Sequence, residues 1–252
     1  MIWAIFGSIL LVLIAYLIYD NYHKLGMQLK LIKYYQKSSF NLTICQISDL
    51  HSRKLNVGLI VKMIEKYKPD VIFYTGDMVD GIKDDLKISL SLIEALKDYP
   101  SFYVLGNHEL RLDRKLSSYL ASLALLGVRV LDNEVVDFKG IKIKGEKPII
   151  KQDFSKINAS YADIVLAHNP EGIKKYNGKY IFSGHAHGGQ FRFMGRGLYS
   201  PGQGLFPKYT KGKYYVDDKV MFVSAGLGGK DFRIRLFNSP NINIVKFSIE
   251  LK

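Results

Sequence analysis

The stretch Phe182-Ser-Gly-His-Ala-His-Gly-Gly-Gln190 places two histidines, His185 and His187, one residue apart and surrounds them with glycines. Residues i and i+2 of an extended segment point to the same side, so both imidazoles can face one pocket. The glycines let the backbone turn sharply and come close to whatever the pocket holds. A solvent-facing loop can carry the same pattern, so a metal site is predicted only if further ligands lie elsewhere in the chain.

The apolar pattern on either side of this stretch predicts alternating strands and helices. Strands are predicted at 42–47, 71–74, 102–105, 164–167 and 180–182, with helices at 57–67, 86–96 and 116–126 and a short helix from Pro170. Short apolar pieces at 128–131, 135–138 and 141–143 and a helix-free tail with strands at 214–216, 220–223 and 242–249 complete the pattern. Two packed sheets flanked by helices account for both parts. We expect one domain at 40–252 after a polar connector at 20–39, and a substrate lip within 191–215.

Polar residues follow five of the predicted strands. They are Asp49 with His51, Asp77 with Asp80, Asn107 with His108, then His168, and finally His185 with His187. Each has an ordinary alternative when taken alone, such as a helix cap for the aspartates, a turn for Asn107 or a loop position for His168. Open α/β sheets place their sites at the carboxyl ends of strands, so five coincidences in one domain favour a shared site. Asp, His and Asn ligands without Cys suit Mn, Fe or Zn ions.

The charge balance favours anionic partners. The 252 residues carry 36 Lys and Arg against 23 Asp and Glu, a formal net charge of +13. Such an excess attracts phosphate esters, acidic lipid surfaces or nucleic acid. The single cysteine, Cys45, excludes an intramolecular disulfide and a zinc site built from cysteines. Cys45 stands in an apolar run, which predicts a buried thiol rather than a nucleophile.

The amino-terminal residues 1–19 are expected to form an uncleaved transmembrane helix, with a buried core helix as the alternative. Residues 2–19 are almost wholly apolar and uncharged, and 18 helical residues span roughly 27 Å, near the hydrocarbon thickness of about 30 Å. Four lysines follow, at 24, 30, 33 and 37. By the positive-inside tendency they predict a single-pass protein of the cell membrane with its main domain on the cytoplasmic side.

The polar strand ends resemble the signature blocks of a known family. Asp49-Leu50-His51, Gly76-Asp77, Gly106-Asn107-His108-Glu109, His168 and Gly184-His185-Ala186-His187 resemble, in order and spacing, the five blocks of the calcineurin-like metallophosphoesterases. Gly188-Gly189-Gln190 and residues 224–228 look like the membrane-anchored bacterial and archaeal branch of that family. The resemblance spans nearly all of 40–252. It implies an α/β fold, a four-layer α/β/β/α sandwich with a two-metal site between the sheet ends.

The resemblance also implies a role for each matching residue. Asp49, His51 and His187 would hold the first metal, Asn107, His168 and His185 the second, and Asp77 would bridge both. His108 would not be a ligand but would face the scissile phosphate as an acid or charge stabiliser. Glu109 stands where many members have Asp and is expected to orient His108. Asp80 matches a common non-ligating position, and the usual Pro-Glu near the end is Pro240-Asn241 here.

The expected function is metal-dependent hydrolysis of phosphate esters by a hydroxide that two divalent metal ions activate. The apolar amino terminus and Arg192, Arg196, Arg233 and Arg235 favour a lipid-linked or other membrane-proximal phosphate, although solvated loops explain the arginines equally well. One alternative is a nuclease or phosphodiesterase on nucleic acid or nucleotides, which no basic helix or stacking motif supports. Another is a catalytically dead scaffold, which would have lost ligands that this chain retains. No protein partner is implied.

Overall fold

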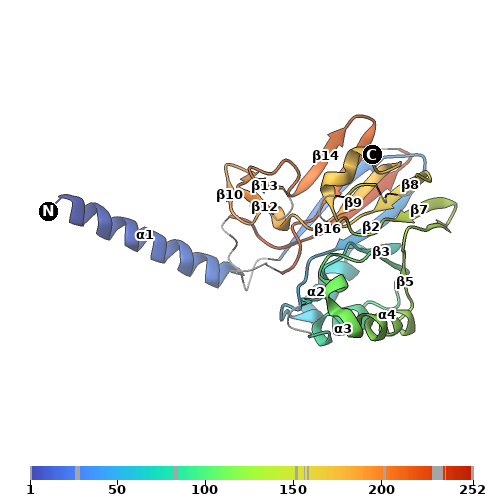
Figure 1. The fold of residues 1–252 in the computed structure, drawn as a ribbon, viewed down its shortest axis with the longest axis horizontal. Coiled ribbons are helices and arrows are strands. Elements are labelled where there is room, and N and C mark those ends of the chain that lie inside the picture. Colours follow the sequence, from blue (N-terminus) through green and yellow to red (C-terminus); the bar gives the residue numbers. More distant parts are fainter. Residues whose placement is uncertain are drawn as a thin grey trace.

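The computed structural model describes residues 2–25, 29–81, 85–150, 153–155, 157, 159–200, 203–228, 235 and 237–250. Helix α1 (Ile2–Leu25) projects away from the rest of the chain (Figure 1), and its apolar side chains are exposed, Trp3 by 89%. No helix among these residues combines the length and the apolar content that crossing a membrane requires. The structure therefore does not support the expected transmembrane helix. The single-pass location and the membrane side that rested on it have no support in the structure.

The first sheet contains six strands. Their order is β1 (Lys30–Lys37), β16 (Asn241–Ser248), β2 (Leu42–Ile47), β3 (Val71–Tyr74), β4 (Ser101–Tyr103) and β5 (Val128–Val130). Strands β2 to β5 run parallel, with Ile44 opposite Val71, and β16 runs antiparallel to β2. Because β2, β3 and β4 are parallel, their carboxyl ends meet at one edge of the sheet.

The second sheet also contains six strands. Their order is β14 (Gly212–Val216), β15 (Lys219–Val223), β9 (Gly178–Ser183), β8 (Ala162–Leu166), β7 (Ile141–Gly145) and β6 (Val135–Phe138). The pairs β15–β9, β9–β8 and β8–β7 are parallel, whereas the outer pairs β14–β15 and β7–β6 are antiparallel. Strands β8 and β9 therefore also end at a common edge.

The two sheets pack face to face over an apolar core. Ile44 and Phe73 of the first sheet meet Phe182 and Phe222 of the second, and all four side chains are fully buried. Alternate residues of β2, such as Cys45, face the other way, against the helices. Such two-sided burial explains why the parallel strands are nearly continuous apolar runs.

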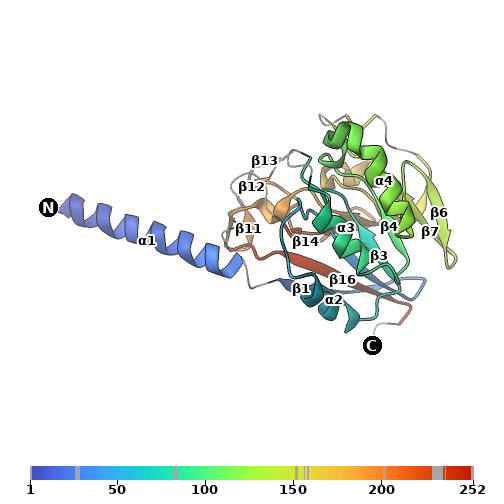
Figure 2. The same ribbon diagram turned by 90° about the horizontal axis from the view of Figure 1, so that it is seen from below.

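Helices cover the outer face of the first sheet. They are α2 (Val57–Glu65), α3 (Lys87–Glu94), the 3-10 helix η1 (Glu109–Lys115) and α4 (Leu116–Leu125), grouped on one side of the sheet (Figure 2). Asn56 caps α2 by accepting a hydrogen bond from the Leu59 N–H at 3.0 Å, and Ile60 and Ile64 bury the apolar face of α2.

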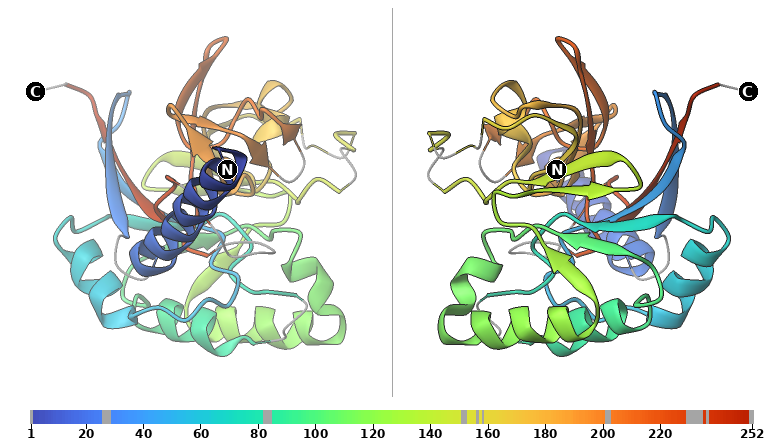
Figure 3. Two further views of the ribbon diagram at one scale, coloured as in Figure 1. Left: turned by 90° about the vertical axis from the view of Figure 1, so that its left-hand side faces the viewer. Right: turned by 90° about the vertical axis from the view of Figure 1, so that its right-hand side faces the viewer.

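The outer face of the second sheet is covered differently from what the sandwich pattern implies. In the described residues this layer consists of the 3-10 helix η2 (Pro170–Lys174) and loop segments rather than α-helices (Figure 3). Ile173, Tyr176 and Tyr209 pack there against Val165 and Ile181. The mixed α/β sandwich is confirmed, but its fourth layer is mostly irregular.

Two segments differ from the sequence-based expectation. Strand β1 lies within the stretch 20–39 that was assigned to a polar connector, and it pairs in parallel with β16 over its whole length. The aperiodic segment 191–215 contains two short hairpins, β10 (Arg192–Phe193) with β11 (Arg196–Gly197) and β12 (Tyr199–Ser200) with β13 (Gly204–Leu205). The hairpins start two residues after the 3-10 turn η3 (His187–Gly189) and its cap Gln190.

Candidate metal centre

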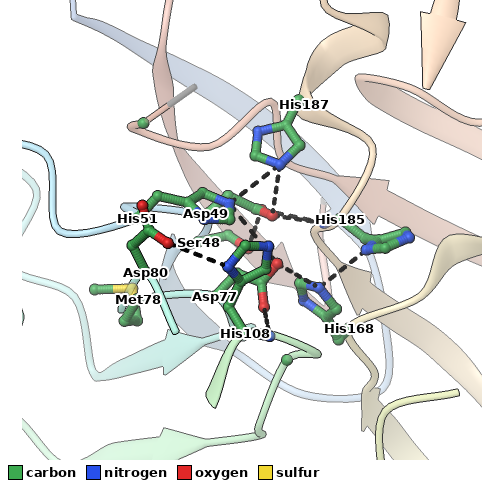
Figure 4. A network of polar contacts seen from close by, with 12 residues as sticks. Ser48, Asp49, His51, Asp77, Met78, Asp80, His108, His168, His185 and His187 are labelled. Atoms are coloured by element: carbon green, nitrogen blue, oxygen red, sulfur yellow. Dashed lines mark hydrogen bonds and ion pairs between the residues drawn. The ribbon is translucent and has the colours of Figure 1, made fainter. Parts of the chain in front are cut away.

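The ends of four strands bring six of the predicted polar residues together in one buried cluster (Figure 4). Asp49 and His51 follow β2, Asp77 follows β3, His168 follows β8, and His185 and His187 follow β9. All six of these side chains are at least nine-tenths buried. Two groups of them could each hold a cation, one of Asp49, His51, Asp77 and His187 and the other of Asp77, His168 and His185, with the ligand atoms of each group within 4.8 Å of one another.

Asp77 lies at the centre of the cluster. Its Oδ2 lies 3.2 Å from Nε2 of His168 and 3.7 Å from Nε2 of His51. Its Oδ1 accepts a hydrogen bond from the His108 N–H at 2.8 Å. Gly106 leaves room for the carboxylate, because a Cβ there would lie 2.2 Å from Asp77 Oδ1. Asp77 is therefore the side chain that the two groups share.

Asp49 is held by its neighbours on the opposite side of the cluster. Its Oδ2 accepts a hydrogen bond from Ser48 Oγ at 2.5 Å, and both of its oxygens accept from the His185 N–H, at 3.0 and 3.1 Å. Oδ1 of Asp49 lies 3.7 Å from Nε2 of His187. Hydrogen bonds from the chain after β9 thus orient the carboxylate that follows β2.

The imidazoles meet in two pairs. Nε2 of His51 and Nε2 of His187 are 3.1 Å apart, and Nδ1 of His185 lies 3.1 Å from Nε2 of His168. Two neutral imidazoles that turn lone pairs toward each other repel unless a proton or a cation lies between them. On the opposite side of the His168 ring, Nδ1 lies 2.8 Å from the Thr75 carbonyl oxygen, which fixes the ring orientation.

Asn107 and His108 follow β4 at the rim of the cluster. Oδ1 of Asn107 is buried and has no hydrogen-bond partner, so it can accept a water or coordinate a cation. The His108 ring packs edge-to-face on His51, with ring centroids 4.4 Å apart. Its Nδ1 lies 3.8 Å from Oδ1 of Asp80, and Nη1 of Arg111 lies 3.5 Å from its Nε2. Sequence reasoning did not single out Arg111.

Glu109 has a different role from the one expected of it. Its carboxylate does not orient His108, which faces Asp80 instead. It accepts hydrogen bonds from four backbone N–H groups and one phenol, those of Asp77 (2.8 Å), Met78 (2.7 Å), Val79 (3.3 Å), Gly106 (2.7 Å) and Tyr103 (2.7 Å). Glu109 thereby joins the loop after β3 to the loop after β4. Its fully buried side chain is a structural support of the cluster.

A chain of hydrogen-bonded, buried side-chain amides connects the strands next to the cluster. Asn241 Oδ1 accepts from the Ala225 N–H at 2.9 Å, and Asn241 Nδ2 donates to Asn243 Oδ1. Asn243 Nδ2 donates to Gln46 Oε1 at 2.8 Å, and Gln46 Nε2 donates to the Ser183 carbonyl at 2.9 Å. These bonds connect β16, β2 and β9, the strands beside the ligand loops. Sequence reasoning did not predict these hydrogen bonds, and it considered Asn241 only as a departure from the family's usual Pro-Glu.

The backbone at the cluster is strained. Asp49, His51, Asp77, His185 and His187 all have positive φ angles, between 48° and 67°. Positive φ is the left-handed region of backbone conformation, which favours glycine, and a non-glycine residue held there costs of order 1–3 kcal/mol. Such strain persists where the surrounding structure enforces it, typically at functional sites. Five of the predicted ligands therefore occupy conformations that serve the placement of their side chains rather than local stability.

The charge states of the cluster suit the binding of cations. Burial lowers the pKa of His51 to about 3 and holds that of His187 well below its usual value, so both rings keep a free lone pair near pH 7. Burial acts to raise the pKa of Asp77, but the nearby His168, His51 and His108 outweigh it and hold that pKa well below the usual value. Burial acts to lower the pKa of His168, but Asp77 and Asp49 raise it to about 10. A cation bound by His168 would replace that proton.

The donor set fits the binding of divalent transition-metal ions. It comprises carboxylates, imidazoles and one amide oxygen, with a central carboxylate that offers two oxygens. Such mixed nitrogen and oxygen ligands suit Mn, Fe or Zn. The orphaned Asn107 oxygen and the facing imidazole nitrogens are polar atoms that a cation would satisfy.

Comparisons with known proteins point to one family. Residues 42–189 match the model of the calcineurin-like phosphoesterases. An uncharacterized metallophosphoesterase of Aquifex aeolicus is 30% identical over 81% of this chain and 84% of its own length. The metallophosphoesterase YkoQ of Bacillus subtilis is 28% identical over 92% of this chain and 95% of its own length. The UDP-2,3-diacylglucosamine pyrophosphatase LpxG of Chlamydia muridarum is 26% identical over 81% and 83%, respectively.

The region that matches the family model covers more than half of the chain and contains the polar ends of all five strands. The family is named for the hydrolysis of phosphate esters, and the relatives above carry the same name or a related one. The chain belongs to the calcineurin-like phosphoesterases and is a metallophosphoesterase.

Proposed function

We propose that the chain hydrolyses phosphate esters with two divalent metal ions, and that the Asp77 carboxylate would help to hold both of them. Asp49, His51 and His187 complete the first site, and Asn107, His168 and His185 complete the second. The observation that supports this most is that Asp77 belongs to both groups of side chains that could hold a cation. A carboxylate can bridge two ions because it has two oxygens, and Asp77 is held between the groups by the His108 N–H.

The residues of the chain position the reaction around such a pair of ions. When bound, two divalent ions polarise the phosphoryl oxygens and make a water nucleophilic near neutral pH. The His108 imidazole lies beside His51 at the rim, where it can donate a hydrogen bond or a proton to the phosphoryl or leaving oxygen. Asp80 faces the other nitrogen of that ring and orients it. No protein nucleophile takes part in this scheme.

The substrate we propose is a phosphate that is linked to a lipid. LpxG, a relative of similar coverage, is named for the cleavage of a diacylated sugar nucleotide. The excess of positive charge, +13 over the whole chain, suits a phosphate group. Exposed apolar side chains in the hairpins beside η3, Phe193 and Leu205 among them, suit an acyl chain.

Hydrolysis assays test the reaction and the substrate separately. The metal-stripped full chain is expected to regain hydrolysis of bis-p-nitrophenyl phosphate or p-nitrophenyl phosphate when Mn is added, whereas His187→Ala is not. Metal-independent turnover, or turnover retained by His187→Ala, contradicts the two-metal reaction.

For the substrate, CDP-dioctanoylglycerol is compared with CDP-glycerol, which shares its headgroup. A kcat/KM at least about tenfold higher for the acylated compound is expected from burying part of its chains, and equal values contradict a lipid-linked substrate.

A further inference from the structure

A second pocket lies outside the metal centre and is lined by cations. Its volume is about 530 Å³, and its walls come from the hairpin β10–β11, from the loop after β13 and from β14. We call it the basic pocket, because five of its lining side chains are cationic and none is Asp or Glu. The five are Arg192, Arg196, Lys208, Lys211 and Lys213.

The positive charge of the basic pocket is not balanced locally. The sequence contains no Asp or Glu between Glu171 and Asp217, a segment that includes every residue of the pocket. In the part of the chain that the structure describes, none of the ion pairs involves the five cations. Burial, with Arg235, Arg192 and Lys30 nearby, lowers the pKa of Lys211 to about 8. Cations placed against cations in a partly buried pocket attract an anion.

The basic pocket is tied to the turn that carries a proposed metal ligand. Arg192 Nη1 donates to the Gly188 carbonyl at 2.7 Å and to Thr210 Oγ1 at 3.0 Å. A Cβ on Gly189 would lie 2.4 Å from Cα of Gly197, so the hairpin β10–β11 packs directly on η3. The two sites therefore share the η3 backbone, but the seven proposed ligands are not among the lining residues of the basic pocket.

Large exposed apolar side chains lie on the hairpins near the basic pocket, and one of them, Phe206, lines it. Phe193 and Met194 at the tip of β10–β11 are 60% and 87% exposed, and Leu205 and Phe206 at the end of β13 are 74% and 79% exposed. Figure 1 shows these hairpins on the side of the domain from which α1 projects. Apolar groups next to clustered cations match a molecule with an anionic head and an apolar tail. An acyl chain can lie against all four side chains, whereas nucleic-acid bases stack on ring faces, which Met194 and Leu205 lack.

We propose that the basic pocket binds a phosphate group of an anionic amphiphile, separately from the metal centre, while the apolar part of that molecule lies against the exposed hairpin residues. Guanidinium and ammonium groups form charge-assisted hydrogen bonds to phosphate oxygens. The side chains of Arg196 and Lys208 are exposed. Among the contacts that the structure describes, Lys208 Nζ lies 5.3 Å from the ring centroid of its neighbour Tyr209, so both cations can be removed with little disturbance of the fold. This binding requires neither metal nor hydrolysis.

Titration calorimetry on the metal-stripped full chain tests the proposal, since without metals the carboxylates of the metal centre repel anions. The probes are inorganic pyrophosphate, monomeric dihexanoyl phosphatidylglycerol, its zwitterionic phosphatidylcholine analogue and a short oligothymidylate. We expect phosphatidylglycerol to bind most tightly. The variant Arg196→Ala/Lys208→Ala is expected to bind it at least about tenfold more weakly, because two charge-assisted contacts are lost.

The matched control is Lys62→Ala/Lys142→Ala, which removes two exposed cations from α2 and β7 and is expected to bind like the unaltered chain. Circular dichroism confirms that both double variants fold. Equal binding of phosphatidylglycerol by the two double variants overturns the proposal, as does the absence of binding. Pyrophosphate binding as tight as that of phosphatidylglycerol refutes the amphiphile, and tighter oligothymidylate binding replaces it with a nucleic acid.

Discussion

Replacing Glu109 by Gln tests whether one buried carboxylate holds the metal-centre loops together. Its Oε1 accepts from the Met78 and Val79 N–H groups and from Tyr103, and its Oε2 accepts from the Asp77 and Gly106 N–H groups. A carboxamide keeps one acceptor oxygen and turns the other position into an NH2 donor. Whichever way the amide is oriented, two backbone N–H groups face that NH2 and lose their acceptor.

The magnitude follows from those two donors. A buried donor left without an acceptor costs about 1–3 kcal/mol, so Glu109→Gln should lower the free energy of unfolding by about 2–6 kcal/mol. Urea unfolding measures this change, with Glu94→Gln on the exposed face of α3 as the control, expected within about 0.5 kcal/mol of the unaltered chain. Manganese affinity should fall as well, because the loops after β3 and β4 separate. A loss of under about 0.5 kcal/mol in Glu109→Gln would refute the reasoning.

Four further predictions follow from the same geometry. Lys144→Met should cost about 3–5 kcal/mol, because it leaves Glu146 buried without the Nζ that lies 2.7 Å away, and adding Glu146→Leu should recover most of that loss in urea unfolding. A double variant as unstable as Lys144→Met alone would count against this. Burial raises the pKa of the Cys45 thiol, so a thiol reagent at pH 8 should modify it only as fast as the protein unfolds, and immediate labelling of the folded chain would disprove it. Asp80→Asn should lower kcat about tenfold and leave the amount of bound metal unchanged, because the Asp80 carboxylate orients His108 and is not a ligand. A variant that binds less metal would show that Asp80 is a ligand. Free Mn at 100 times its Kd should raise the free energy of unfolding by about 2.7 kcal/mol per site in urea titrations, and no shift would mean that the fold does not hold the metal.

The strand ends could be predicted from sequence because the chemistry of the site is local to each of them. Asp49 and His51, for example, follow a buried apolar run directly, and the parallel order of β2, β3 and β4 then brings their ends together. The apolar runs also predicted most strands and helices to within a few residues, because two-sided burial leaves a strong pattern.

Other features leave no such pattern. Strand β1 mixes lysines with half-buried apolar residues because it lies at the edge of the sheet beside β16, and edge strands commonly carry lysine. The bonds of Glu109 go to backbone groups about 30 residues earlier in the chain, where any residue type supplies the same N–H. Each strand of the hairpins within 191–215 is only two residues long, which is too short for an alternation of apolar and polar residues to show.

Anomalous diffraction from crystals of the full chain grown with Mn is the most direct test of the central claim. The account predicts two anomalous peaks about 3.5–4 Å apart, with the Asp77 carboxylate between them and the Asn107 oxygen directed at one. A matched crystal of Asp77→Asn should show weaker peaks or none. A single peak in the unaltered chain, or two peaks that Asp77 does not join, would contradict the two-metal centre.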